Sequence, residues 1–159
     1  MQYEGPALFL DSDMIVLDDI SKLFELKDET ALQVVKDQKR FEWPSMMLFD
    51  CGQCKELTLD YVENSDPMSL SWATKIGNLP LEWNHCVSYV PKPETTPKLI
   101  HYTQGVPIWP EVRDCDYAEE WWDEYRAMTS TCSWLELMGN SVHAKPVMER
   151  LVNFDGVDY

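Results

Sequence analysis

The sequence has 159 residues, about the length of one domain, with 13 basic against 28 acidic side chains and a net charge of −15. This charge argues against a nucleic-acid backbone or an anionic membrane as the main partner, because both would be repelled. It leaves room for a divalent cation, which acidic clusters attract. The 45% of apolar residues and 12% of aromatic residues exclude a disordered chain and predict a sizeable core.

The first predicted elements flank a short acidic sequence. Ala7–Leu10 is a continuous apolar run, which indicates a buried strand, and it stops at Asp11-Ser12-Asp13. Met14–Leu17 resumes as a second apolar run. Asp18 and Asp19 are typical of a helix start, and apolar residues follow at helical spacing as far as Leu26.

Further short elements are predicted in the middle of the chain. Strands are expected over Leu32–Val35 and Met46–Phe49, and a weak helix over Leu57–Val62. Asp66 followed by Pro67 is typical of a helix start, so a helix is expected from there to about Ile76, ending at Gly77.

The later part of the chain is predicted to alternate loops with strands and to end in helix. A loop is expected over Leu79–Asn84, a strand over Val87–Val90, a loop over Pro91–Pro97, a strand over Lys98–Ile100 and a loop over His101–Pro110. Tyr117–Leu137 is expected to be the longest helix, with Trp121, Trp122 and Tyr125 near one side. Short strands alternating with helices predict an α/β fold.

Five cysteines, an odd number, argue against a disulfide framework. The single Cys51-Gly-Gln-Cys54 motif leaves a zinc or redox site open, but no second ligand pair follows, so reduced and partly buried thiols are the favoured interpretation. No signal peptide or membrane-spanning run is recognisable, so we expect a cytoplasmic protein.

The most informative motif is Asp11-Ser12-Asp13 at the end of a predicted buried strand. Two carboxylates one residue apart can converge on Mg²⁺ or Mn²⁺, whose shell substrate phosphates commonly complete. His101, at the end of another predicted strand, could supply a third ligand. A polar junction without a metal is the alternative for the acidic motif, and a core or surface histidine for His101.

Pro6–Leu26 resembles the metal-binding strand and following helix of GT-A fold glycosyltransferases, most closely the glycogenin-like and lipopolysaccharide galactosyltransferase-like group, glycosyltransferase family 8. Leu79–Asn84 and Lys98–Gly105 resemble that group's later loop and its histidine-bearing strand, while Trp43–Phe49 takes the place of the strand lining the sugar pocket. The resemblance extends from Pro6 to about Trp109.

The resemblance implies a sugar transferase using a nucleotide-diphosphate sugar, with an unknown acceptor (a saccharide, a lipid-linked saccharide or a protein) and retention of anomeric configuration. Asp11, Asp13 and His101 would hold Mn²⁺ or Mg²⁺. The implied donor contacts are Ser12, Gln104 and Gly105. The implied sugar or acceptor contacts are Trp43, Ser45, Trp83, Asn84 and Trp109.

Two features depart from that group. The lysine usually found six residues after the histidine is replaced by Pro107, for which Arg113 is a candidate substitute. Only ten residues precede Asp11, so the strands that bind the nucleotide base are expected to be absent. We therefore expect one partial GT-A-like domain, with a metal and sugar region over 1–110 and a helical region over 111–159. Its exposed sheet edge predicts a second copy or a complementing chain, or a truncated gene product.

Two other classes of function stay open. A haloacid-dehalogenase-like phosphatase also has an apolar strand followed by DxD, although its later lysine and acidic pair are not recognisable here. A non-catalytic interaction module, or an inactive transferase remnant, is the second alternative. The stretch Glu111–Arg126, with seven acids against two arginines, could then dock a basic partner.

Overall fold

The computed structural model describes residues 4–142, 144–147 and 149. The chain divides into two compact units. The first comprises Met1–Cys86 and Pro93–His101, and the second comprises Val87–Lys92 and Tyr102–Tyr159. All strands of the described residues lie in the first unit, while the second contains the longest helix, so the chain is mixed α/β.

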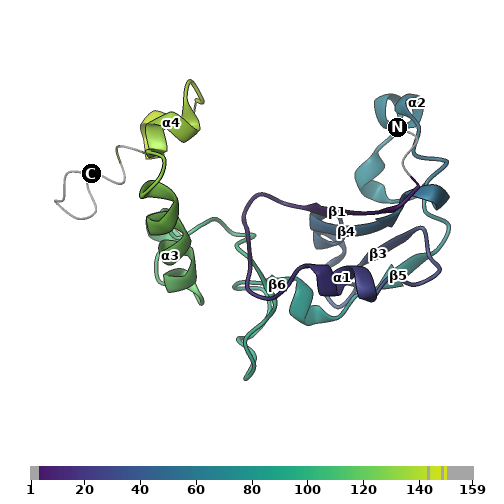
Figure 1. Cartoon of the computed structure of the whole chain (residues 1–159), viewed down its shortest axis with the longest axis horizontal. Coiled ribbons are helices and arrows are strands. Elements are labelled where there is room, and N and C mark those ends of the chain that lie inside the picture. Colours follow the sequence, from purple (N-terminus) through teal and green to yellow (C-terminus); the bar gives the residue numbers. More distant parts are fainter. Residues whose placement is uncertain (1–3, 143, 148, 150–159) are drawn as a thin grey trace. The chain divides into compact units, whose positions relative to one another are not determined.

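A four-stranded sheet forms the centre of the first unit (Figure 1). Its strands, in spatial order, are β1 (Pro6–Leu10), β4 (Met46–Asp50), β3 (Leu32–Val34) and β5 (Ile76–Asn78). β4 runs antiparallel to β1 and β3, whereas β3 and β5 are parallel. β1 lies at one edge of the sheet formed by the described residues, as expected. The partner that would cover this edge stays a prediction.

The apolar run of β4 is continuous because both faces of the sheet are covered. Met46 and Leu48 point to a core that includes Leu23 and Trp83, while Met47 belongs to a second cluster around Trp72. Alternate side chains of a strand point to opposite faces, so one strand contributes to both clusters.

A second sheet carries the histidine of the predicted site. It has the order β2 (Met14–Val16), β7 (Leu99–His101) and β6 (His85–Cys86). β2 runs antiparallel to β7, and β6 runs parallel to it. The helices of the first unit are α1 (Ser21–Glu25) and α2 (Leu59–Asn64). Asp19 accepts a hydrogen bond from the backbone N–H of Ser21, which explains the helix-start signal at this point.

The second unit is built on aromatic side chains of α3 (Ala118–Thr129) and α4 (Trp134–Met138). Tyr125 is buried with Ile108 and Val147, and the ring centroids of Trp121 and Tyr125 are 5.4 Å apart. The single helix expected over Tyr117–Leu137 is therefore wrong at its middle. The hydroxyls of Thr129, Ser130 and Thr131 donate to backbone carbonyls at the end of α3. A new helix, α4, then begins with a capping box formed by Ser133 and Glu136.

Two other expected elements are also wrong. The helix predicted from Asp66 is only the 3₁₀ turn Pro67–Ser69, because Leu70 has a left-handed φ of 59°. Val87–Val90 forms turns and a bend, since Ser88 has a φ of 69°, and the strand lies earlier, at His85–Cys86. Local residue types suggested both elements, and left-handed residues ended them.

Candidate metal centre

The turn between β1 and β2 contains the Asp11-Ser12-Asp13 motif. Its position is fixed from both sides. The backbone N–H of Asp11 donates to the carbonyl oxygen of Ser45, at 2.9 Å, and Met14 pairs with His101 in the β2–β7 register. The topology thus brings together two segments that are far apart in the sequence.

Asp11, Asp13 and His101 offer ligand atoms that all lie within 4.8 Å of one another. The Nε2 atom of His101 is 3.4 Å from Oδ1 of Asp13, and the imidazole is buried whereas Asp13 is partly exposed. Two carboxylate oxygens and one imidazole nitrogen form a donor set that suits Mn²⁺ or Mg²⁺, so these residues fit the metal implied by the sequence.

The two carboxylates differ in acidity. Burial, together with the charge of Asp13, raises the pKa of Asp11 above its ordinary value. Burial also opposes ionisation of Asp13, but its contact with His101 outweighs this and lowers the pKa of Asp13. Asp11 consequently carries its negative charge at a cost, which a bound cation would offset.

A set of buried polar groups lies on the other side of the His101 ring. Its Nδ1 atom is 3.1 Å from Oδ1 of Asn84, 3.5 Å from Sγ of Cys86 and 3.7 Å from Oε2 of Glu42. The amide nitrogen of Asn84 donates to the hydroxyl of Ser45. All four residues behind the ring are buried, so protein groups and not bulk water contact its Nδ1 side. They are Glu42, Ser45, Asn84 and Cys86.

Glu42, Cys86 and His101 also form a group of potential ligands within 4.8 Å. Burial, together with the charges of Glu42 and Asp13, raises the pKa of Cys86 to about 12. A thiol must lose its proton to bind a metal, so this group is poorly suited to a cation at neutral pH. We therefore assign the exposed side, with Asp11 and Asp13, as the candidate metal centre.

Several residues expected to contact sugar have other surroundings. Ser45 and Asn84 lie in the buried group behind His101, and the Trp83 ring has no exposed surface within the core. The half-buried Trp43 ring is covered by the guanidinium of Arg40, whose carbon lies 4.3 Å from the ring centroid. Ser12 is exposed within the acidic turn.

Gln104, Gly105 and Trp109, the other expected donor and sugar contacts, belong to the second unit. Gly105 has a φ of 114°, and a Cβ there would lie 3.2 Å from Trp109, so both the backbone and the space require glycine.

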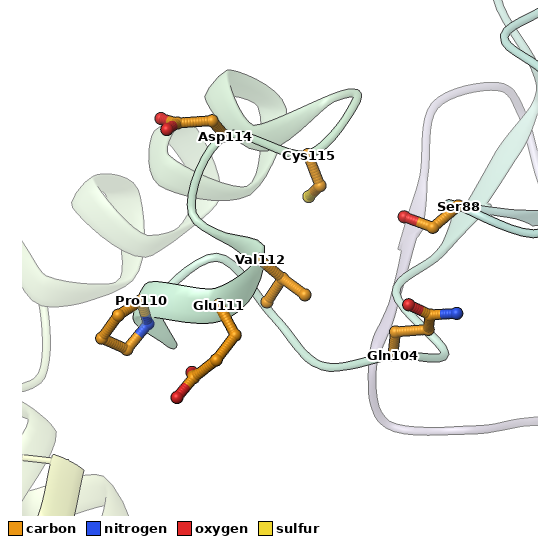
Figure 2. Close-up of a pocket in the computed structure, with 7 residues that line it drawn as sticks. All are labelled: Ser88, Gln104, Pro110, Glu111, Val112, Asp114 and Cys115. Atoms are coloured by element: carbon orange, nitrogen blue, oxygen red, sulfur yellow. The ribbon is translucent and has the colours of Figure 1, made fainter.

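Gln104 lines a polar pocket of about 290 Å³ within the second unit (Figure 2). The amide of Gln104 and the hydroxyl of Ser88 lie on one side of it, and Glu111 and Asp114 come from the segment before α3. The pocket therefore offers mainly hydrogen-bond acceptors and few cationic groups.

The Cys51-Gly-Gln-Cys54 motif does not form a reactive pair in this structure. Both thiols are free, and the Cys54 thiol donates to the carbonyl of Asp50 at 3.1 Å. Burial, together with the nearby Cys51 and Asp50, raises the pKa of Cys54 to about 11. Redox motifs depend on a lowered thiol pKa, so the favoured interpretation of partly buried, reduced cysteines agrees with the structure.

Comparison with known proteins identifies the fold. No family model matches the chain. Among curated proteins, Protein CDI of Arabidopsis thaliana is 32% identical over 153 residues, covering 77% of this chain and 58% of the plant protein. Two crystal structures of the glycosyltransferase GlyE of Streptococcus pneumoniae TIGR4, one of them the apo form, each have a TM-score of 0.54.

The GlyE structures are 21% and 20% identical to this chain, of which they cover 76% and 94%. Over the part of the chain that aligns with GlyE, the fold is that of a glycosyltransferase. It spans 58% of the length of the plant protein and 40% and 44% of the two GlyE chains. Among the described residues, no helix is long and apolar enough to cross a membrane.

Sequence reasoning found Asp11, Asp13 and His101 but missed Glu42 and Cys86. Glu42 lies in an acidic chain with no local sign of burial, yet it is 3% exposed. Cys86 directly follows two polar residues, Asn84 and His85, and is fully buried in β6. Neither position carries a sequence signal of its own, because both are buried by strands that are distant along the chain.

Proposed function

We propose that this chain is part or all of a metal-dependent glycosyltransferase of the GT-A type, related to family 8, which uses a nucleotide-diphosphate sugar. The observation that carries the proposal is the convergence of Asp11, Asp13 and His101 within a fold shared with a glycosyltransferase. That fold favours a transferase over the phosphatase alternative. His101 is brought beside the Asp11-Ser12-Asp13 motif by the pairing of β2 with β7.

The proposed mechanism assigns each residue a role. Asp11 and Asp13 supply the negative charge that attracts a divalent cation, and His101 supplies a nitrogen ligand from β7. A cation bound there would act as a Lewis acid and offset charge on the departing diphosphate. We place Ser12, Gln104 and Gly105 at the donor. The donor sugar, the acceptor and retention of configuration stay proposals by resemblance.

The first experiment measures metal binding directly. Thermal unfolding is followed with and without Mn²⁺, and the free Mn²⁺ is quantified by electron paramagnetic resonance. We expect Mn²⁺ to raise the Tm, because a ligand that binds only the native state stabilises it. At 100 times the dissociation constant the stabilisation is about 2.7 kcal/mol, which corresponds to a Tm increase of roughly 5–11 °C for a chain of this size.

Asp13→Asn should abolish that shift, because it removes one charged ligand oxygen. Asp37→Asn is the matched control, since Asp37 is an exposed carboxylate of the same unit. A Tm shift of equal size in wild type and Asp13→Asn would reject the metal assignment. Calorimetric titration with uridine and guanosine diphosphate sugars in the presence of Mn²⁺ then tests the donor class.

A further inference from the structure

Only one assignment of donors and acceptors is possible for the hydrogen bonds behind His101. The hydroxyl oxygen of Ser45 is 2.6 Å from the backbone carbonyl oxygen of Glu42. A carbonyl can only accept, so Ser45 must donate its single proton to Glu42. The Ser45 oxygen is then available only as an acceptor toward its other neighbour.

That neighbour is the side-chain amide of Asn84, 3.0 Å away. The group facing Ser45 must therefore be the amide NH₂, which turns the amide oxygen toward His101. This oxygen lies 3.1 Å from Nδ1 of His101. An amide oxygen can only accept, so Nδ1 must carry a hydrogen.

We propose that Ser45 and Asn84 are positioning residues that hold a hydrogen on Nδ1 of His101, so that in the neutral ring the Nε2 lone pair is left for the candidate cation site formed with Asp11 and Asp13. The orientation serves the proposed metal site and in that respect rests on the proposed function. The tautomer itself follows from the buried contacts alone.

Two competing contacts are weaker. Asp13 accepts a hydrogen bond from Nε2 when both ring nitrogens carry a hydrogen, and, although burial opposes it, this contact lowers the pKa of Asp13. Its 3.4 Å separation is longer than the 3.1 Å between Nδ1 and Asn84, and Asp13 is partly exposed, so Nε2 is the nitrogen that gives up its hydrogen when the ring is neutral or binds a cation. The Cys86 thiol, 3.5 Å from Nδ1, could donate to that atom, but it also lies 3.6 Å from the Asn84 oxygen. A thiol is a weak donor, whereas an Nδ1 lone pair would face both the Asn84 oxygen and the Glu42 carboxylate.

The hydrogen-bonded residues behind His101 are shielded from solvent. Ser45 is 4% exposed, Asn84 1% and His101 2%, so no bulk water can replace a lost partner. Partners of this kind set the orientation and basicity of metal-binding histidines, and their loss typically weakens metal binding by about 10- to 100-fold.

The test reads the tautomer without metal or substrate. Long-range ¹H–¹⁵N correlation spectra of the ¹⁵N-labelled 159-residue chain are recorded at a pH where the imidazole is neutral, and His101→Gln assigns the signals. We expect the Nδ1–H pattern for wild type. Ser45→Ala frees the Asn84 amide to rotate, so we expect a mixture of tautomers and about tenfold weaker Mn²⁺ binding.

Ser130→Ala is the matched control, because Ser130 also donates to the carbonyl of the residue three positions earlier, but on an exposed helix end. It should leave both readouts unchanged. A predominant Nε2–H tautomer in wild type would overturn the proposal even if Ser45→Ala failed to fold. An Nδ1–H tautomer in wild type without Mn²⁺ binding would support the positioning role and reject the metal-dependent function.

Discussion

The charges of Asp11 and Asp13 have opposite effects on the stability of the metal-free protein. The pKa of Asp11 is raised, so its ionised form destabilises the fold above that pKa. The pKa of Asp13 is lowered, so its ionised form stabilises the fold at neutral pH, and this stability is lost as pH falls through the lowered value.

We therefore predict opposite effects of two equivalent substitutions. Asp11→Asn should leave the metal-free Tm unchanged or raise it by up to about 2 °C, and Asp13→Asn should lower it by a similar amount. Asp13→Asn should abolish the Mn²⁺-dependent increment, and Asp11→Asn should reduce it. Scanning calorimetry at pH 7 with and without Mn²⁺ measures all four values. Equal metal-free shifts of the same sign would contradict the assignment of the two pKa directions.

The same difference predicts how metal binding depends on pH. Asp11 takes up its proton at a higher pH than Asp13 as the solution is acidified, because its pKa is raised and that of Asp13 is lowered. Loss of Mn²⁺ affinity on the acid side should therefore begin with Asp11. In the Asp11→Asn variant any residual affinity should persist to lower pH than in wild type, as measured by Mn²⁺ titration between pH 4 and pH 7.

Residue types predict the candidate metal ligands but not the residues behind them. A DxD at a strand end and a histidine at another strand end suffice to suggest a cation site. The roles of Ser45 and Asn84 depend on which side of His101 they occupy, and that is decided by the pairing of β6 with β7. Trp83 was expected at the sugar, but the core includes it, since aromatic type alone does not reveal burial.

At the scale of elements, the centre of β5 leaves no room for a side chain at Gly77 unless neighbouring side chains move. A Cβ on Gly77 would lie 2.6 Å from side-chain atoms of Asp28, Thr30 and Gln33. Asp28 is hydrogen-bonded to Thr30, and the backbone N–H of Asp28 donates to Gln33, so these groups cannot all move without losing bonds.

Gly77→Ala should consequently lower the free energy of unfolding by about 1–3 kcal/mol, the range for overpacking. Gly52→Ala is the matched control, because the nearest atom to its Cβ is 3.3 Å away, against 2.6 Å at Gly77, and the residue lies partly buried in the short 3₁₀ helix Cys51–Gln53 of the same unit. Urea denaturation compares the two, and an equal loss in both variants would contradict the packing argument.

The elements most easily predicted were those set by apolar runs. The bounds of β1, β3, β4 and β7 are predicted within a residue or two, because each has a mostly apolar sequence. The burial expected for β1 is wrong, because this strand lies at the edge of the sheet and none of its residues is fully buried. The break between α3 and α4 was missed. Serine and threonine can bond to their own helix, and whether they end it depends on the following cap, here Ser133.

At the scale of the molecule, the division into two units separates the predicted roles. The three candidate ligands belong to the first unit, whereas Gln104, Trp109 and the polar pocket belong to the second. The second unit has its own core, with Tyr125 7% exposed among aromatic neighbours. Metal binding and the stability of the second unit should then be separable properties.

Tyr125→Ala tests this separation. Removing a buried ring should cost about 3–5 kcal/mol in the second unit, because the cavity cannot be filled by the surrounding rigid indoles. The Mn²⁺ dissociation constant should change less than about twofold, since every candidate ligand and every group behind His101 lies in the first unit. Calorimetry reports the first quantity and electron paramagnetic resonance the second, with the exposed Leu135→Ala as control. A tenfold loss of Mn²⁺ affinity in Tyr125→Ala alone would mean that metal binding depends on the folding of the second unit, and it would contradict the separation of the two properties.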